Sequence, residues 1–173
     1  MLLLIPIAVG ALAGLVASGR IANWLDSPLR WPWVVVVALL VREAVALTPL
    51  RHIDVLRFVY AAFLLVLIGW TVWHVKRLPG VWIIGLGALM NLAVIAANDF
   101  RMPVVAAYAG KLVEAGNSGQ YTVMDSSTRL AFLGDRLATP VWLGGVYSPG
   151  DVVIGLGAGI VAFLLTAWYR ARV

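Results

Sequence analysis

The sequence predicts an all-α, polytopic membrane protein with five transmembrane helices and a short helical extracytoplasmic cap. The 173-residue chain is 62% apolar and 12% charged, whereas a soluble domain is roughly half apolar and about a quarter charged. Five apolar segments have the length needed to cross a hydrocarbon core about 30 Å thick, which takes roughly 20 helical residues. Backbone amides in lipid must be paired within a segment, so runs of this length form helices rather than barrel strands.

The five predicted spans divide the chain into three parts. The spans are residues 2–18, 31–48, 55–75, 81–97 and 152–169. The first is expected to be a retained helix and not a signal peptide, because no Lys or Arg precedes its apolar run. Residues 1–97 then hold helices 1 to 4, residues 98–151 an extracytoplasmic segment with short amphipathic helices, and residues 152–173 helix 5 and a cytoplasmic tail.

Basic residues in the short loops predict the orientation. One side would carry six of them, and the other short loop two, Arg51 and Arg57. The six are Arg20, Arg30, Lys76, Arg77, Arg170 and Arg172. The positive-inside rule therefore places the N-terminus outside, the C-terminus in the cytoplasm and residues 98–151 outside. Seven of the eight tryptophans fall toward the predicted cytoplasmic ends, as an interfacial aromatic belt would.

Composition and motifs argue against several function classes. The chain has no Cys, which excludes disulfides and thiolate metal sites. Its net charge of +5 is scattered between apolar runs and not gathered on one face, so no nucleic-acid partner is expected. No GxSxG motif is present, and His52-Ile53-Asp54 offers too few ligands for a metal. The sequence therefore predicts no catalytic residue, no metal and no cofactor.

Several short patterns predict helix contacts and helix ends. Gly10 and Gly14 in the first span, and Gly155 and Gly159 in the last, are GxxxG pairs that allow two helix backbones to approach closely. Leu78-Pro79-Gly80 is a turn short enough to make its flanking helices an antiparallel pair. Ser148-Pro149-Gly150-Asp151 has the residues of a capping box, which is typical of the start of a helix.

Three polar residues lie within predicted spans, namely Arg42, Glu43 and Asn91. Ionisable side chains at such depth are costly and usually face a protein interior or a water-filled cavity. Adjacent helical residues point about 100° apart, so Arg42 and Glu43 each need a separate partner. Asn91 is the obvious buried partner. These residues have two possible roles, which are hydrogen bonding between helices and lining a path for an ion or a substrate.

The extracytoplasmic segment is expected to contain two short helical pieces. Residues 104–115 are predicted as an amphipathic helix at the membrane surface. A second helical turn is expected through Leu130-Ala131-Phe132-Leu133, closed by Gly134. Phe132 and Leu133 would pack on the top of the bundle, whereas Arg129, Asp135 and Arg136 would stay in water.

With these residues in view, the chain resembles the bacterial membrane proteins grouped as DUF5317, a family of unknown function. The likeness rests on Gly19-Arg20 with Leu29-Arg30-Trp31, on Asn98 with Arg101-Met102-Pro103-Val104, on residues 128–135 and on residues 148–151. Asp99-Phe100 stands where the family has two glycines, and Glu43 where it has an amide. The resemblance implies a multi-pass protein of the bacterial cytoplasmic membrane and carries no activity.

The resemblance also directs attention to Asn98, Arg101, Arg129 and Asp135 on the outer side. Arg101 has the chemistry to bind a lipid phosphate or a carboxylate. Alternatively, Arg101 or Arg129 pairs with Asp135 and fastens the outer segment to the bundle.

Three functions are compatible with the sequence. The first is a non-enzymatic accessory or scaffold subunit that packs against other membrane proteins or forms a homo-oligomer. The second is a small oligomeric transporter or lipid-handling protein that uses Arg42, Glu43 and Asn91 as an internal site. The third is an outer-face hydrolase or transferase that uses Asp135 and Arg129 on lipid-linked substrates.

Overall fold

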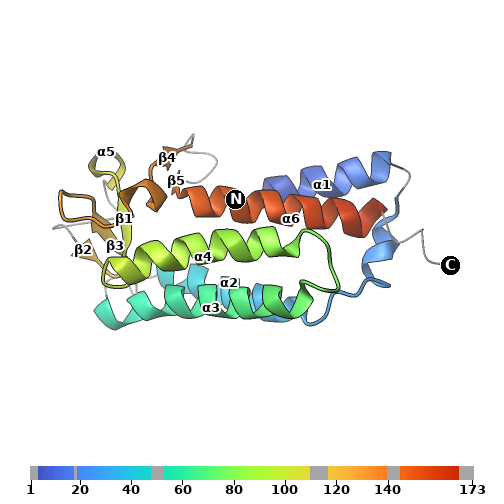
Figure 1. The fold of residues 1–173 in the computed structure, drawn as a ribbon, viewed down its shortest axis with the longest axis horizontal. Coiled ribbons are helices and arrows are strands. Elements are labelled where there is room, and N and C mark those ends of the chain that lie inside the picture. Colours follow the sequence, from blue (N-terminus) through green and yellow to red (C-terminus); the bar gives the residue numbers. More distant parts are fainter. Residues whose placement is uncertain (1–3, 18, 48–52, 110–116, 140–144, 168–173) are drawn as a thin grey trace.

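Helices form most of the structure (Figure 1). It is a computed structural model, and it describes residues 4–17, 19–47, 53–109, 117–139 and 145–167. The long helices are α1 (Leu4–Val16), α2 (Pro32–Leu47), α3 (Arg57–His74), α4 (Val81–Ala97) and α6 (Pro149–Ala167). The short ones are η1 (Ile21–Trp24), η3 (Asp54–Leu56), α5 (Ala106–Ala109) and η6 (Ala131–Leu133).

The long helices pack one against the next in a series that is called the row from here on, and Figure 1 shows α2 behind α3 and α4. Along the row, α1 packs on α6, α6 on α4, α4 on α3 and α3 on α2 (Figure 1). The turn at Leu78-Pro79-Gly80 makes α3 and α4 antiparallel neighbours, and Gly80 adopts a φ of 83°, a left-handed conformation that glycine accepts without strain. The chain between α4 and α6, called the cap from here on, lies at one end of the long helices.

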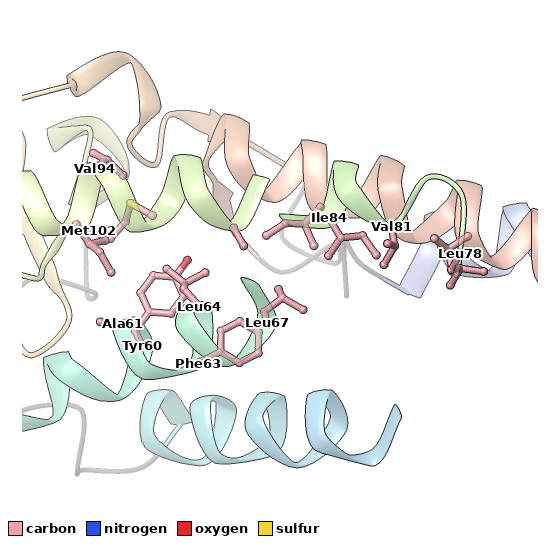
Figure 2. Packing of buried hydrophobic residues seen from close by; sticks show 14 of the residues in the cluster. Tyr60, Ala61, Phe63, Leu64, Leu67, Leu78, Val81, Ile84, Val94 and Met102 are labelled. Carbon is pink, nitrogen blue, oxygen red and sulfur yellow. The ribbon is translucent and has the colours of Figure 1, made fainter. Parts of the chain in front are cut away.

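The core lies between α3 and α4 and between α4 and α6. Figure 2 shows Tyr60, Leu64 and Leu67 of α3 directed toward α4. Leu64, Val81 and Ile95 are fully buried, so the apolar stripes of α3 and α4 are matched over most of their length. Met102 extends this core into the cap.

The prediction that the cap is all-helical is wrong, because the cap contains strands. β1 (Met102–Val104), β2 (Asn117–Ser118) and β3 (Tyr121–Val123) form a sheet in the order β1-β3-β2, with β1 parallel and β2 antiparallel to β3. β4 (Leu137–Ala138) and β5 (Val146–Tyr147) pair antiparallel.

The apolar run that starts at Met102 begins as a strand because it is buried by partners distant in sequence. All three β1 residues are buried, and Met102 pairs with Tyr121 in the parallel register. A short apolar run does not reveal by periodicity whether it is a buried strand or a helix. Of the predicted helix over 104–115, α5 is the helical part in the described residues, and 110–116 lie outside them.

The second helical turn expected in the cap is present, but one of its side chains points elsewhere than expected. The turn closed by Gly134 is present as η6, and Leu133 packs on the core as expected. Phe132 is 61% exposed instead of packed on the bundle, because a turn of three residues can direct only part of its side chains inward.

Among the described residues, length and composition single out α3 and α6 as helices able to cross a membrane, which is fewer than the five spans that the sequence predicts. α1 and α4 are apolar but shorter, with 13 and 17 residues. Large apolar side chains are nevertheless exposed along α1, α2, α3, α4 and α6, for example Leu12, Val36, Leu65, Leu89 and Leu156.

Candidate functional site

The most concentrated charges of the described structure lie where the row meets the cap. Asp54 precedes α3, Arg57 begins it, and Asp99 and Arg101 lie between α4 and β1. The Arg57 and Arg101 Nη1 atoms lie 2.9 and 2.7 Å from the Asp99 Oδ2 atom. Asp54 accepts from Arg101 and lies 3.4 Å from Arg57. These four residues, the charge cluster, fasten the start of α3 to the entry of the cap.

Burial within the charge cluster is uneven. The side chains of Arg57 and Arg101 are 18% and 13% exposed, whereas those of Asp54 and Asp99 are 64% and 70% exposed. The two guanidinium groups are thus largely withdrawn from water, and the two carboxylates neutralise them from the solvent side. Because exposed carboxylates are screened, each pair stabilises the fold modestly, but removing one leaves a buried cation with fewer partners.

The backbone at Asp99 and Phe100 adopts a conformation that favours glycine. Both residues have a φ of 58°, in the left-handed region that non-glycine residues rarely occupy. The resemblance described in the sequence analysis implies glycines at these two positions. In this chain the ion pairs of Asp99 and the ring contact between Phe100 and Phe58, with centroids 5.0 Å apart, hold the turn in place.

Asn98 clamps the cap to the end of α4. Its Nδ2 atom donates to the Val94 carbonyl at 2.7 Å and to the Arg129 carbonyl at 2.7 Å, and its Oδ1 atom accepts from the Arg129 N–H at 3.0 Å. The contact with Arg129 therefore runs through its backbone, while its side chain is exposed.

Asp135 is buried, which corrects the expectation that it stays in water. It is 6% exposed, and its backbone pairs with β1, donating to the Pro103 carbonyl at 2.8 Å and accepting from the Val105 N–H at 3.1 Å. Arg101 forms ion pairs with Asp54 and Asp99. The charge cluster and Asn98 thus fasten the cap to the bundle.

A polar cleft opens beside the charge cluster. Its volume is about 600 Å³, and Asn98, Asp99, Arg101, Thr122, Val123, Asp125, Ser127 and Thr128 are among its lining residues. The Ser127 hydroxyl and backbone N–H donate to Asp125 at 2.7 and 2.8 Å. These bonds hold the pKa of Asp125 below its ordinary value of 3.8, so this carboxylate is charged at neutral pH.

Asn91 is the centre of a second polar group, inside the row. Its Nδ2 atom donates to the Tyr60 hydroxyl at 3.2 Å and to Asp151 Oδ1 at 2.8 Å. Its Oδ1 atom accepts from the Ser148 hydroxyl at 2.7 Å. Ser148 and Asp151 are the two ends of the predicted capping box, and each bonds the other's backbone N–H. Asn91 thus joins α3, α4 and the start of α6.

Arg42 and Glu43 lie within α2, and their side chains are outside the described part of the structure. The structure therefore does not test whether they face Asn91. Among the described residues, no three His, Asp or Glu side chains form a group that could hold a metal ion.

The glycines of the GxxxG pairs lie where backbones approach most closely. A Cβ built on Gly10 would lie 2.0 Å from the Gly159 carbonyl oxygen, and one on Gly159 would lie 2.8 Å from the Pro6 carbonyl oxygen. Gly14 faces Phe163 and Thr166 of α6. Gly155 is buried in α6. Three of the four glycines therefore lie at the α1–α6 contact.

Sequence reasoning did not find the charge cluster, although it named Arg101. Asp54 and Arg101 are separated by 47 residues, and Arg57 and Asp99 by 42, so no local spacing links them. One signal in the sequence could have found it. The two spans expected to be antiparallel neighbours each carry an acid and an arginine at the ends that meet, Asp54 with Arg57 and Asp99 with Arg101.

Replacing Asp99 with asparagine is expected to lower the free energy of unfolding by about 1 kcal/mol at low salt. Asparagine tolerates the left-handed backbone, so the change removes mainly the charge shared by Arg57 and Arg101. Thermal unfolding in detergent at low and high salt measures the effect, which shrinks as salt screens the pairs. Asp26→Asn, at an exposed site far from the charge cluster, is the control. Equal stabilities of the two variants would contradict the role of Asp99.

Comparisons with known proteins support a family and no activity. No curated protein and no solved structure matches the chain. The model of a family described as a family of unknown function, DUF5317, matches residues 26–165. The matched stretch includes the charge cluster, Asn98 and the Asn91 group, and it confirms the resemblance drawn from the sequence. Because the family model matches well over half of the chain, this chain belongs to the DUF5317 family.

Proposed function

We propose that this chain is a non-enzymatic accessory or scaffold subunit of the bacterial cytoplasmic membrane, packing against other membrane proteins. In this proposal α1, α2, α3, α4 and α6 all cross the bilayer, with the N-terminus and the cap outside and the C-terminus inside. The observation that carries it is the single row of helices with apolar side chains exposed along it.

The lengths of α3, α4 and α6 fit a bilayer with modest adjustment. α3 and α6 have 18 and 19 residues, close to the roughly 20 that a full crossing takes. α4 has 17 residues and is therefore about 26 Å long. A bilayer accommodates a short helix by local thinning and by the anchoring of flanking residues, at a small cost per ångström.

The exposed apolar surface is larger than a soluble monomer tolerates. Leu12 is 62% exposed, Leu65 57% and Leu89 53%, and they lie on three different helices. Contiguous apolar surface of this kind marks contact with lipid or with another protein. Helices that each pack only on their neighbours expose more apolar surface than the helices of a compact bundle. This additional surface is available for contact with another protein.

The polar interior favours a structural role over transport. The Asn91 amide is engaged by Tyr60, Ser148 and Asp151. In the described residues a row of helices, unlike a closed bundle, encloses no central path, so transport would require an oligomer. The hydrolase alternative has less support, because Asp135 is buried while the Arg129 side chain is exposed.

Purification of the native protein in a gentle detergent, with mass analysis of everything that co-purifies, tests the proposal. A photoreactive residue at Leu65 or Leu89 is expected to crosslink to one or a few defined membrane proteins, and the same residue at Ser126 in the cap is the control. Stoichiometric partners crosslinked from the helix faces support the subunit role. A protein that purifies alone, with crosslinks to lipid only, would exclude it.

A further inference from the structure

An aromatic and basic surface lies at the ends of the long helices opposite the cap. The rings of Trp31, before α2, and Trp73, near the end of α3, stack with centroids 5.6 Å apart. The Arg77 guanidinium lies 4.8 Å from the Trp73 ring centroid, and its Nη1 atom donates to the Trp73 carbonyl at 2.6 Å. Trp73 thus contacts both Trp31 and Arg77, and these three residues are called the Trp–Arg stack.

The stack is built on a rigid base. The Arg30 N–H donates to His74 Nε2 at 3.0 Å, and the Trp70 indole donates to the Arg30 carbonyl at 3.0 Å. His74 Nδ1 lies 2.8 Å from the Trp70 carbonyl, so these partners assign the Nδ1–H tautomer, with Nε2 as the acceptor. The entry to α2 is thereby fixed against the end of α3. Trp31 has a φ of 51°, an unusual conformation for a bulky residue, and its ring lies on Trp73.

The same end is positively charged. Arg20, Arg30, Lys76 and Arg77 are exposed there, and Asp26 is the exposed acid among the described residues of these loops. The stack itself is accessible, since Trp31 is 53% and Trp73 50% exposed. Aromatic side chains half in contact with protein and half exposed are typical of the headgroup level of a bilayer, and clustered basic residues at that level attract anionic lipids.

We propose that the Trp–Arg stack is a binding site for an anionic phospholipid. The lipid phosphate accepts from the outward edge of the Arg77 guanidinium, with Lys76 adding a second positive charge. The acyl chains lie along exposed apolar residues next to the stack in sequence, which include Val72, 66% exposed, and Trp33, 61% exposed. This inference rests on the proposed membrane location, and it selects phospholipid over free phosphate because the basic surface continues into an apolar one.

Native mass spectrometry of the detergent-solubilised protein tests the site. The protein is mixed with equal amounts of dioleoyl phosphatidylglycerol and dioleoyl phosphatidylcholine, which share their acyl chains and differ in headgroup. The wild-type protein is expected to retain phosphatidylglycerol preferentially. Arg77→Gln is expected to reduce that preference about fivefold, the effect of one basic residue at a membrane surface. Arg136→Gln, an exposed position in the cap, makes the same charge change and is expected to leave the preference intact.

Equal retention of the two lipids by the wild-type protein would overturn the site, as would equal losses of preference in the two variants. Displacement of the lipid by inorganic phosphate would also overturn it, because the site would then bind a free anion. Circular dichroism of each variant verifies that it is folded. Failure of this site leaves the membrane orientation and the accessory role untouched, since cysteine labelling and co-purification measure those separately.

Discussion

Replacing Asn91 with leucine is expected to lower the free energy of unfolding by about 2–4 kcal/mol. The change removes hydrogen bonds to Tyr60, Ser148 and Asp151. An interhelical hydrogen bond in a membrane contributes about 0.6 kcal/mol on average, and a buried polar group left without its partner costs about 1–3 kcal/mol more. Gly150 adds to the effect, because a Cβ there would lie 2.1 Å from the Asn91 side-chain oxygen, so the space is tightly fitted to the amide.

Unfolding by a denaturing detergent, followed by circular dichroism, measures this loss. Thr71→Val is the matched control: Thr71 is 2% exposed, but its hydroxyl donates within its own helix, to the Ile68 carbonyl at 2.8 Å. Its loss is expected to be less than half that of Asn91→Leu. Equal effects of the two substitutions would show that the Asn91 group does not join the helices.

Gly10→Leu is expected to separate α1 from α6 and to lower the free energy of unfolding by about 1–3 kcal/mol. Any side chain at Gly10 meets the backbone of Gly159, which cannot move aside as a flexible side chain could. Gly69→Leu is the control, because no atom lies within 4 Å of a Cβ built there, and leucine has the higher helix propensity.

The separation of α1 is measured by protease protection together with unfolding. In the Gly10 variant, α1 is expected to become accessible to cleavage while α3 and α4 stay protected. If both glycine variants behave as the wild-type protein does, the close approach of α1 and α6 does not stabilise the fold.

The parts of the fold that local chemistry determines were predicted well. α4 begins and ends where the sequence analysis placed it, at Val81 and Ala97, and Pro79 and the left-handed Gly80 directly precede its first residue. The capping box at Ser148 and Asp151 is present. α6 nevertheless starts at Pro149, three residues before the predicted span, because apolar content alone does not detect the polar first turn of a helix.

The parts that depend on distant partners were not predictable from one sequence. β1 is a strand because β3, about 20 residues further on, pairs with it. Asp135 is buried because its backbone pairs with β1, whereas its charge alone predicts that Asp135 lies in water. The charge cluster depends on the antiparallel packing of α3 and α4, which brings Arg57 beside Asp99. Each of these features follows from tertiary contact and not from local propensity.

Single-cysteine labelling in intact bacterial cells tests the five-span arrangement most directly, because the chain contains no native Cys to give a background. Cysteines replace Ala22, Ile53, Lys76 and Ser126, four exposed residues in the four loops that separate the long helices. A membrane-impermeant maleimide is expected to label Ile53→Cys and Ser126→Cys in intact cells, and Ala22→Cys and Lys76→Cys only after permeabilisation. Labelling of all four positions in intact cells, or of Ser126→Cys and Lys76→Cys from the same side, would contradict the arrangement.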